Sequence, residues 1–160
     1  LVTGVQTCAL PILLRIAKLT DYAIVVMVEL THAVDEVHSA QRLAEATRLE
    51  LPTVSKLLKL LTRAGLVRSF RGVNGGYRMD RPAGEISVAD IITAIEGPIA
   101  MTQCSVDPGL CQQEDSCTLQ SNWQRISQAV AAAMEEVSLA EMAQVPANTK
   151  TGLQIAAYNA

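Results

Sequence analysis

Several features that mark other classes of protein are scarce or missing in this chain of 160 residues. Aromatic residues make up only 3% of it, and no run of 18 apolar residues occurs, so we expect no membrane span. No Ser, His and Asp set and no paired-carboxylate motif is present. The glycines of residues 72–76 lack the strand-to-helix setting of a phosphate-binding loop. These absences predict that the protein is not an enzyme.

Cysteine is also scarce, but it is concentrated. Three of the four cysteines, Cys104, Cys111 and Cys117, lie in one polar segment with six and five residues between them. Their odd number argues against a disulfide framework and against secretion, so we expect a cytoplasmic protein. Thiolates favour iron–sulfur clusters, zinc or copper(I). Three unrelated thiols, or one disulfide with a spare thiol, remain open, although structural cysteines usually lie among apolar residues.

Charge is divided unevenly along the chain, although the formal net charge is only −3. Residues 13–81 carry 11 Lys and Arg against 7 Asp and Glu, whereas residues 82–160 carry 2 against 9. From Pro52 to Arg81 there are 7 basic residues and 1 acidic residue. A local basic patch attracts phosphate whatever the total charge. We therefore expect the first half of the chain to bind nucleic acid.

The first half also has the order of elements found in a helix-turn-helix domain. Thr20 or Asp21 is expected to cap a first helix, and Ser39 to start a short second one. Pro52 suits the first position of a third helix, and Gly65 suits its C-terminal stop. Helix, short helix, turn and helix is the helix-turn-helix plan.

A basic hairpin is predicted next, at residues 66–79, and is called the wing below. Leu66–Phe70 alternates like a strand, residues 73–76 form a turn, and Tyr77–Met79 returns. Three arginines would lie on the wing: Arg68, Arg71 and Arg78.

The second half is expected to contain a linker at Pro82–Glu85, a helix from Ser87 to Gly97, the cysteine segment and a long helix. Apolar residues recur along that long helix at helical spacing: Leu119, Trp123, Ile126, Val130, Met134 and Val137. This stripe either packs on its own domain or pairs with another subunit. Residues 138–143 extend the helix or add a turn.

Four regions follow from this pattern. Residues 13–82 form a winged helix-turn-helix domain, residues 83–143 carry the cysteine segment and dimerisation helix, and residues 144–160 form an unstructured tail. Residues 1–12 are expected to be non-native, because Val2–Ile12 matches the translation of a sequencing-adapter oligonucleotide. Cys8 would then have no biological role. The fold class is mostly α with a small β-hairpin.

The ordered combination of segments resembles IscR-type iron–sulfur regulators of the Rrf2 superfamily of winged-helix proteins. The resemblance is carried by RIAKLTDYAIVVM, GLVRSFRGVNGGY, ISVADIITAIEGP and the three-cysteine segment followed by Trp123. It is strongest toward the regulator of the SUF iron–sulfur assembly system. It implies a homodimer that binds double-stranded operator DNA and represses iron–sulfur assembly genes. It also implies a cluster, [2Fe–2S] rather than [4Fe–4S], held by the three cysteines.

The fourth cluster ligand is left open by the resemblance. Some relatives use a histidine at the position of Gln120, and a neutral amide is a weak iron ligand. Others use an aspartate in the first helix of the partner subunit, which corresponds to Asp21. An aspartate there suits a helix cap equally well.

Base contacts are expected near the start of the third helix, from Thr53, Ser55 and Lys56. Phosphate contacts are expected from Lys59, Arg63 and Arg71. His32 and His38 are predicted to be surface residues. Two alternatives compete with cluster sensing: a nitric-oxide-sensing or thiol-redox-sensing regulator of the same family, and a zinc-stabilised interaction module. The gaps between the cysteines fit structural zinc poorly.

Overall fold

The computed structural model describes residues 16–102, 105 and 117–144. Its elements, in chain order, are α1 (Lys18–Thr31), α2 (Ala40–Thr47), α3 (Leu51–Arg63), β1 (Val67–Phe70), β2 (Gly76–Met79), the 3₁₀ turn η1 (Ala83–Glu85), α4 (Val88–Glu96), α6 (Gln120–Glu135) and α7 (Leu139–Ala143). The predicted fold class is confirmed: the chain is mostly helical, with one antiparallel hairpin in a winged helix-turn-helix arrangement. The predictions for residues 1–12 and for the tail after Gln144 lie outside the described residues.

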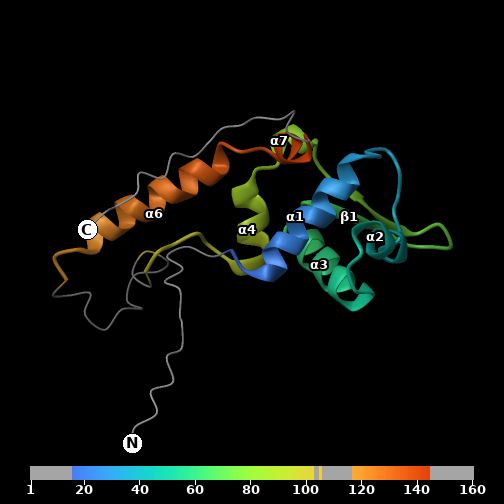
Figure 1. Ribbon diagram of the computed structural model, residues 1–160, viewed down its shortest axis with the longest axis horizontal. Coiled ribbons are helices and arrows are strands. Elements are labelled where there is room, and N and C mark those ends of the chain that lie inside the picture. The colour runs from blue at the N-terminus through green and yellow to red at the C-terminus, as the bar shows by residue number, and fades with distance from the viewer. Residues whose placement is uncertain (1–15, 103–104, 106–116, 145–160) are drawn as a thin grey trace, which may run out of the picture.

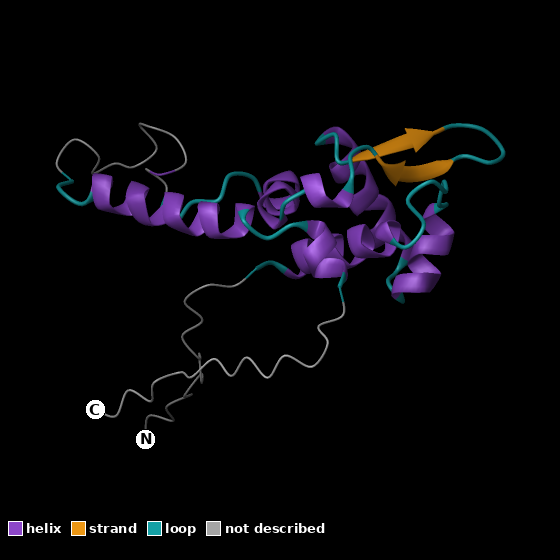
Figure 2. Cartoon of the chain, turned by 90° about the horizontal axis from the view of Figure 1, so that it is seen from above, coloured by secondary structure: helices purple, strands orange, loops and turns teal. Residues whose placement is uncertain are grey.

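The molecule is elongated, with the hairpin at one end and α6 reaching away at the other (Figures 1 and 2). The core lies where α1, α2, α3 and α4 meet. α3 contributes fully buried residues at helical spacing, and Leu57, Leu58 and Leu61 are each 0% exposed. Burying one leucine side chain contributes about 1.5–3 kcal/mol. The short α7 also returns to this core through the fully buried Leu139.

Local sequence sets most of the helix ends. The Ser39 hydroxyl accepts the backbone N–H of the third residue of α2, and Ser87 begins α4 in a capping box with Asp90. At the end of α3, Gly65 takes a left-handed φ of 73°. The N–H of Leu66 then bonds to the carbonyl of the last α3 turn, 3.0 Å away. Pro52 is the second residue of α3, one later than predicted, because Leu51 begins the helix.

The start of α1 differs from the prediction. The residue before the helix is Ala17, so neither Thr20 nor Asp21 is the N-cap. Thr20 is fully buried and donates its hydroxyl proton to the carboxylate of Glu96, whereas Asp21 is an exposed residue of the first turn. The cap interpretation of Asp21 is therefore wrong, because a residue of α4 occupies the end of α1.

His38 is buried, which corrects the prediction of a surface position, while His32 is exposed. His38 forms an isolated antiparallel bridge with Tyr77, and its backbone N–H and carbonyl each bond across it at 2.8 Å. Gly76 permits this approach, since a Cβ there would lie 2.4 Å from the His38 carbonyl oxygen. The wing is thereby joined to the segment between α1 and α2.

The long helix α6 is the least covered element described. Of its residues only Ser127 is buried, while Trp123 and Ile126 are 38% and 42% exposed. Its later turns contact α4, and Met134 packs against the core. Within the described residues, no helix is both long and apolar enough to cross a membrane.

Candidate nucleic-acid interface and cysteine segment

The N-terminus of α3 is open to a ligand. No side chain caps it, because Glu50 precedes the helix without accepting one of its first N–H groups. Thr53 and Ser55 are half-buried there, and Lys56 is exposed. Leu51 is 39% exposed at the same end. It was not among the predicted contacts, although an exposed apolar side chain at this position can touch a thymine methyl group.

The seven basic residues between Pro52 and Arg81 fall into two groups. Arg68 forms an ion pair with Asp80, with nitrogen and oxygen 2.6 Å apart, and Arg81 lies 3.6 Å from Asp90. The Arg78 guanidinium stacks over an aromatic ring of the wing. The other four are exposed and have no ion pair within the described residues: Lys56, Lys59, Arg63 and Arg71.

These four unpaired cations all belong to the predicted DNA-contacting set. They lie on the outer face of α3 and in the loop of the wing, so their charges are not neutralised by the protein itself. Coulombic attraction for phosphate is strongest for such free charges. The fold therefore leaves a basic surface that runs from α3 to the wing.

A hollow of about 340 Å³ lies between α3 and the wing. Lys59 and Arg63 line it from α3, and Ser69 and Tyr77 line it from facing positions of the two wing strands. Cations and hydroxyl groups of this kind are common partners of DNA phosphates. Ser69 and Tyr77 were not predicted from the sequence, because only the pairing of β1 with β2 places them beside α3.

The predicted cluster ligands are only partly described. Cys104 and Cys111 lie outside the described residues, and Cys117 is a half-buried free thiol just before α6. Gln120 is the half-buried first residue of α6, and Asp21 is exposed on α1. Among the described residues, no three His, Cys, Asp or Glu side chains gather in a group that could hold a metal ion.

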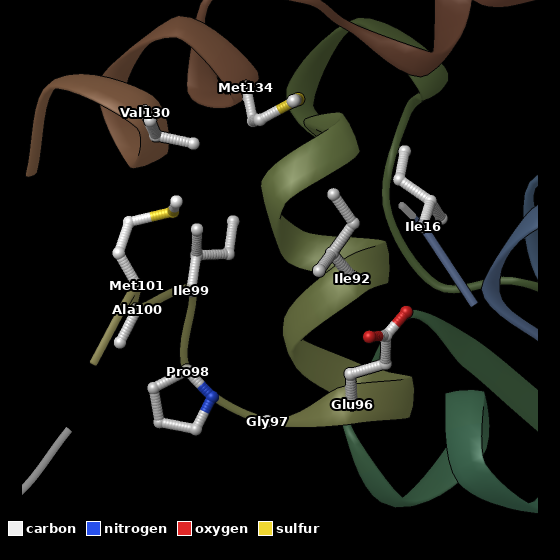
Figure 3. Close-up of a pocket in the computed structure, with 10 residues that line it drawn as sticks. All are labelled: Ile16, Ile92, Glu96, Gly97, Pro98, Ile99, Ala100, Met101, Val130 and Met134. Atoms are coloured by element: carbon white, nitrogen blue, oxygen red, sulfur yellow. The ribbon is translucent and has the colours of Figure 1, made fainter. Parts of the chain in front are cut away.

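The segment that leads to Cys104 is fixed to both neighbouring helices. Residues 97–101 leave α4 at Gly97, whose φ of 93° turns the chain, and are called the strap below. At its far end, the Met101 N–H donates to the buried Ser127 hydroxyl of α6, 3.0 Å away. Strap, α4 and α6 enclose an apolar cavity of about 370 Å³, shown in Figure 3.

The comparisons with known proteins agree with this arrangement. Residues 16–145 match the family model of Rrf2, described as an iron-dependent transcriptional regulator. The transcriptional regulator IscR of Xenorhabdus nematophila is 29% identical over 130 residues, which cover 81% of this chain and 79% of that protein.

Two solved structures are also similar to this chain. The IscR of T. potens has a TM-score of 0.61 at 28% identity, covering 81% of this chain and 85% of its own. CymR, the global cysteine regulator of B. subtilis, has a TM-score of 0.63 at 27% identity, covering 81% of this chain and 96% of its own.

Proposed function

Because this chain belongs to the Rrf2 family of transcriptional regulators, we propose that it reads operator DNA with α3 and the wing under the control of an iron–sulfur cluster. The prediction that it is not an enzyme is confirmed by the family, whose members regulate transcription. The observation that carries the proposal is the set of unpaired cations on α3 and the wing, in the same molecule as a free cysteine thiol at the base of α6.

DNA is bound by the two ends of the basic surface in different ways. Thr53, Ser55 and Lys56 reach base edges from the first turns of α3, which enter the major groove. Lys59, Arg63 and Arg71 contact phosphates and so fix the register of the protein on the duplex. The wing is held at its angle to α3 by the bridge between His38 and Tyr77.

The protein acts as a homodimer through α6. The apolar stripe of this helix is more than one-third exposed at four residues: Leu119, Trp123, Ile126 and Val137. Apolar surface of this extent on one helix marks a protein–protein interface. A two-fold dimer presents two copies of α3 to two half-sites, which matches a palindromic operator.

The donor set fits an iron–sulfur cluster, because three thiols and no competing disulfide partner for Cys117 are the ligands that such clusters use. Cys104, Cys111 and Cys117 would hold it, and a shell of only three thiolates would make it labile toward oxygen, nitric oxide or iron loss. The exposed Asp21 carboxylate is proposed as the fourth ligand, from the partner subunit, ahead of Gln120. [2Fe–2S] is the favoured type. The similarity to IscR supports iron–sulfur assembly genes, including the SUF system, as targets.

Anaerobic purification tests the proposal, with a visible spectrum and counts of iron and acid-labile sulfide. We expect broad absorption between roughly 320 and 460 nm, as thiolate-held clusters give, and matched iron and sulfide. The triple variant with Cys104, Cys111 and Cys117 changed to Ser should be colourless yet still folded. A colourless wild-type protein that also resists reconstitution would rule out the cluster.

A thiol-redox sensor is the second candidate, supported by the similarity to CymR. In that case the free thiol of Cys117 would respond to oxidants directly, without metal. Peroxide treatment followed by mass spectrometry separates the two candidates. A disulfide that forms in a colourless protein, and that weakens or strengthens operator binding, would favour the thiol sensor.

A further inference from the structure

The start of α1 is capped by a residue far away in the sequence. Ala17 precedes the helix, and no side chain from its own neighbourhood accepts the free N–H groups of the first turn. Instead the carboxylate of Glu96, the last residue of α4, accepts the Ala17 N–H at 3.1 Å and the Thr20 hydroxyl hydrogen bond through the same oxygen. Figure 3 shows the Glu96 side chain extending toward the segment before α1 that carries Ile16.

Electrostatics make this contact specific to the pair of helices. A carboxylate at the C-terminal end of its own helix opposes that helix dipole, so Glu96 does not stabilise α4. The same charge at the N-terminus of α1 is favourable. Thr20 is 0% exposed, so loss of the carboxylate would leave a buried hydroxyl group without a partner.

Glu96 is also the first anchor of the strap. The strap begins directly after it and ends at Met101, whose N–H bonds to Ser127 of α6. Cys104 follows three residues later. The chain that leads to the cysteines is therefore held at one end by α1 and at the other by α6.

We propose that Glu96 is a positioning residue that couples the cysteine segment to the reading head, defined as residues 18–79. The inference rests on the proposed function and deepens it. A change in the cysteine segment pulls on the strap, shifts the Glu96 carboxylate and loosens the first turn of α1. Because α1 packs against both α2 and α3, that loosening alters how α3 is presented to DNA.

Native-state hydrogen exchange tests the coupling without requiring any cluster. The Thr20 and Asp21 amides, which bond to the Ala17 carbonyl, report on the first turn of α1. Glu96→Ala should speed their exchange by on the order of tenfold, through local opening. Ser127→Ala, which releases the far end of the strap, should speed it by about threefold in the wild-type background but not in the Glu96→Ala background.

The matched control is Glu136→Ala, an exposed glutamate at the end of α6 that should leave exchange in α1 unchanged. Wild-type exchange in Ser127→Ala, or effects of the two substitutions that simply multiply, would overturn the proposal.

Operator binding provides the second readout, as the ratio of affinities of the cluster-loaded and cluster-free protein. Thr20→Val and Glu96→Ala should both shrink this ratio by about fivefold or more, within the range of typical allosteric couplings, while iron and sulfide counts stay at the wild-type level. A purely structural role would lower both affinities together and leave the ratio unchanged, which contradicts the proposal. A wild-type protein without a cluster defeats the proposed function alone, because the exchange experiment still decides the role of Glu96.

Discussion

The reading head and α6 are built on opposite terms. In the head, each helix buries an apolar face in the same core, and side chains such as Met27 and Leu57 are fully buried. α6 buries only Ser127 and leaves Trp123 and Ile126 largely in solvent. The head therefore carries its own stability, whereas α6 has an apolar surface that is completed only by a partner.

Charge follows the same division. The head holds the excess of basic residues, and residues 82–160 hold an excess of acidic ones. Phosphate is thus attracted to one end of an elongated molecule and repelled from the other. This asymmetry orients the protein on DNA with the wing and α3 facing the duplex and α6 pointing away from it (Figure 1).

The largest effect is expected from emptying the core of the head. Leu57→Ala removes a fully buried side chain of α3 and should lower the free energy of unfolding by about 2–5 kcal/mol. Urea denaturation of the purified protein measures it. Lys56→Ala, at the exposed neighbouring position, is the control and should stay within about 0.5 kcal/mol of wild type. A small loss for Leu57→Ala would mean that the head is not the stable part.

A charge on the stripe of α6 should separate dimerisation from folding. Ile126→Asp places an unpaired carboxylate in the proposed interface and should weaken the dimer by at least about a hundredfold. Sedimentation equilibrium measures this, and circular dichroism should show helical content close to wild type. Ser121→Asp adds the same charge at an exposed position of α6 outside the stripe and should leave the dimer intact. Equal association by both variants would remove α6 from the interface.

Sequence reasoning recovered the parts of the fold that depend on neighbours in the chain. Ser39, Gly65 and Ser87 were placed correctly because a cap or a stop is a local event. The beginning of α1 was missed because its cap is Glu96, 76 positions beyond Thr20. His38 was misplaced because its burial comes from pairing with the wing, which has no local pattern.

The candidate site shows the same limit. The excess of cations could be read from the sequence, but their availability could not. Arg68 and Arg81 are paired because Asp80 and Asp90 fold back beside them, and such pairing depends on tertiary structure. Ser69 and Tyr77 entered the hollow beside α3 for the same reason. Composition indicates which charge a surface has, and the fold decides which side chains offer it.

A smaller effect is expected from single cations of the interface. Arg63→Ala removes an unpaired charge and should weaken operator binding by about fivefold to tenfold, with the salt dependence of log K reduced by about one. Arg68→Ala removes a cation that Asp80 already neutralises, so its effect should be less than about twofold. Fluorescence anisotropy at several salt concentrations measures both. Equal losses would show that the ion pair opens on DNA.

The smallest effect concerns α7, where the two regions join. Leu139 at its start donates its N–H to the Ile86 carbonyl at 2.7 Å, and the Ser138 backbone N–H and hydroxyl both donate to the Glu141 carboxylate. These two bonds lower the pKa of Glu141 below its usual value. A lowered pKa means that this cap contributes stability above the ordinary pKa of glutamate, and that the contribution is lost as pH falls through the lowered value.

Glu141→Gln should therefore reduce the melting temperature slightly at neutral pH, and the difference from wild type should disappear in acid. Thermal unfolding across that range measures it, with Glu136→Gln as the control that shows no such pH dependence. Because α7 carries the backbone link between α6 and the head, a parallel change in exchange at Leu139 would locate the effect at the junction. A constant offset at every pH would instead mean that the substitution acts through packing, and that the junction is insensitive to the charge of its cap.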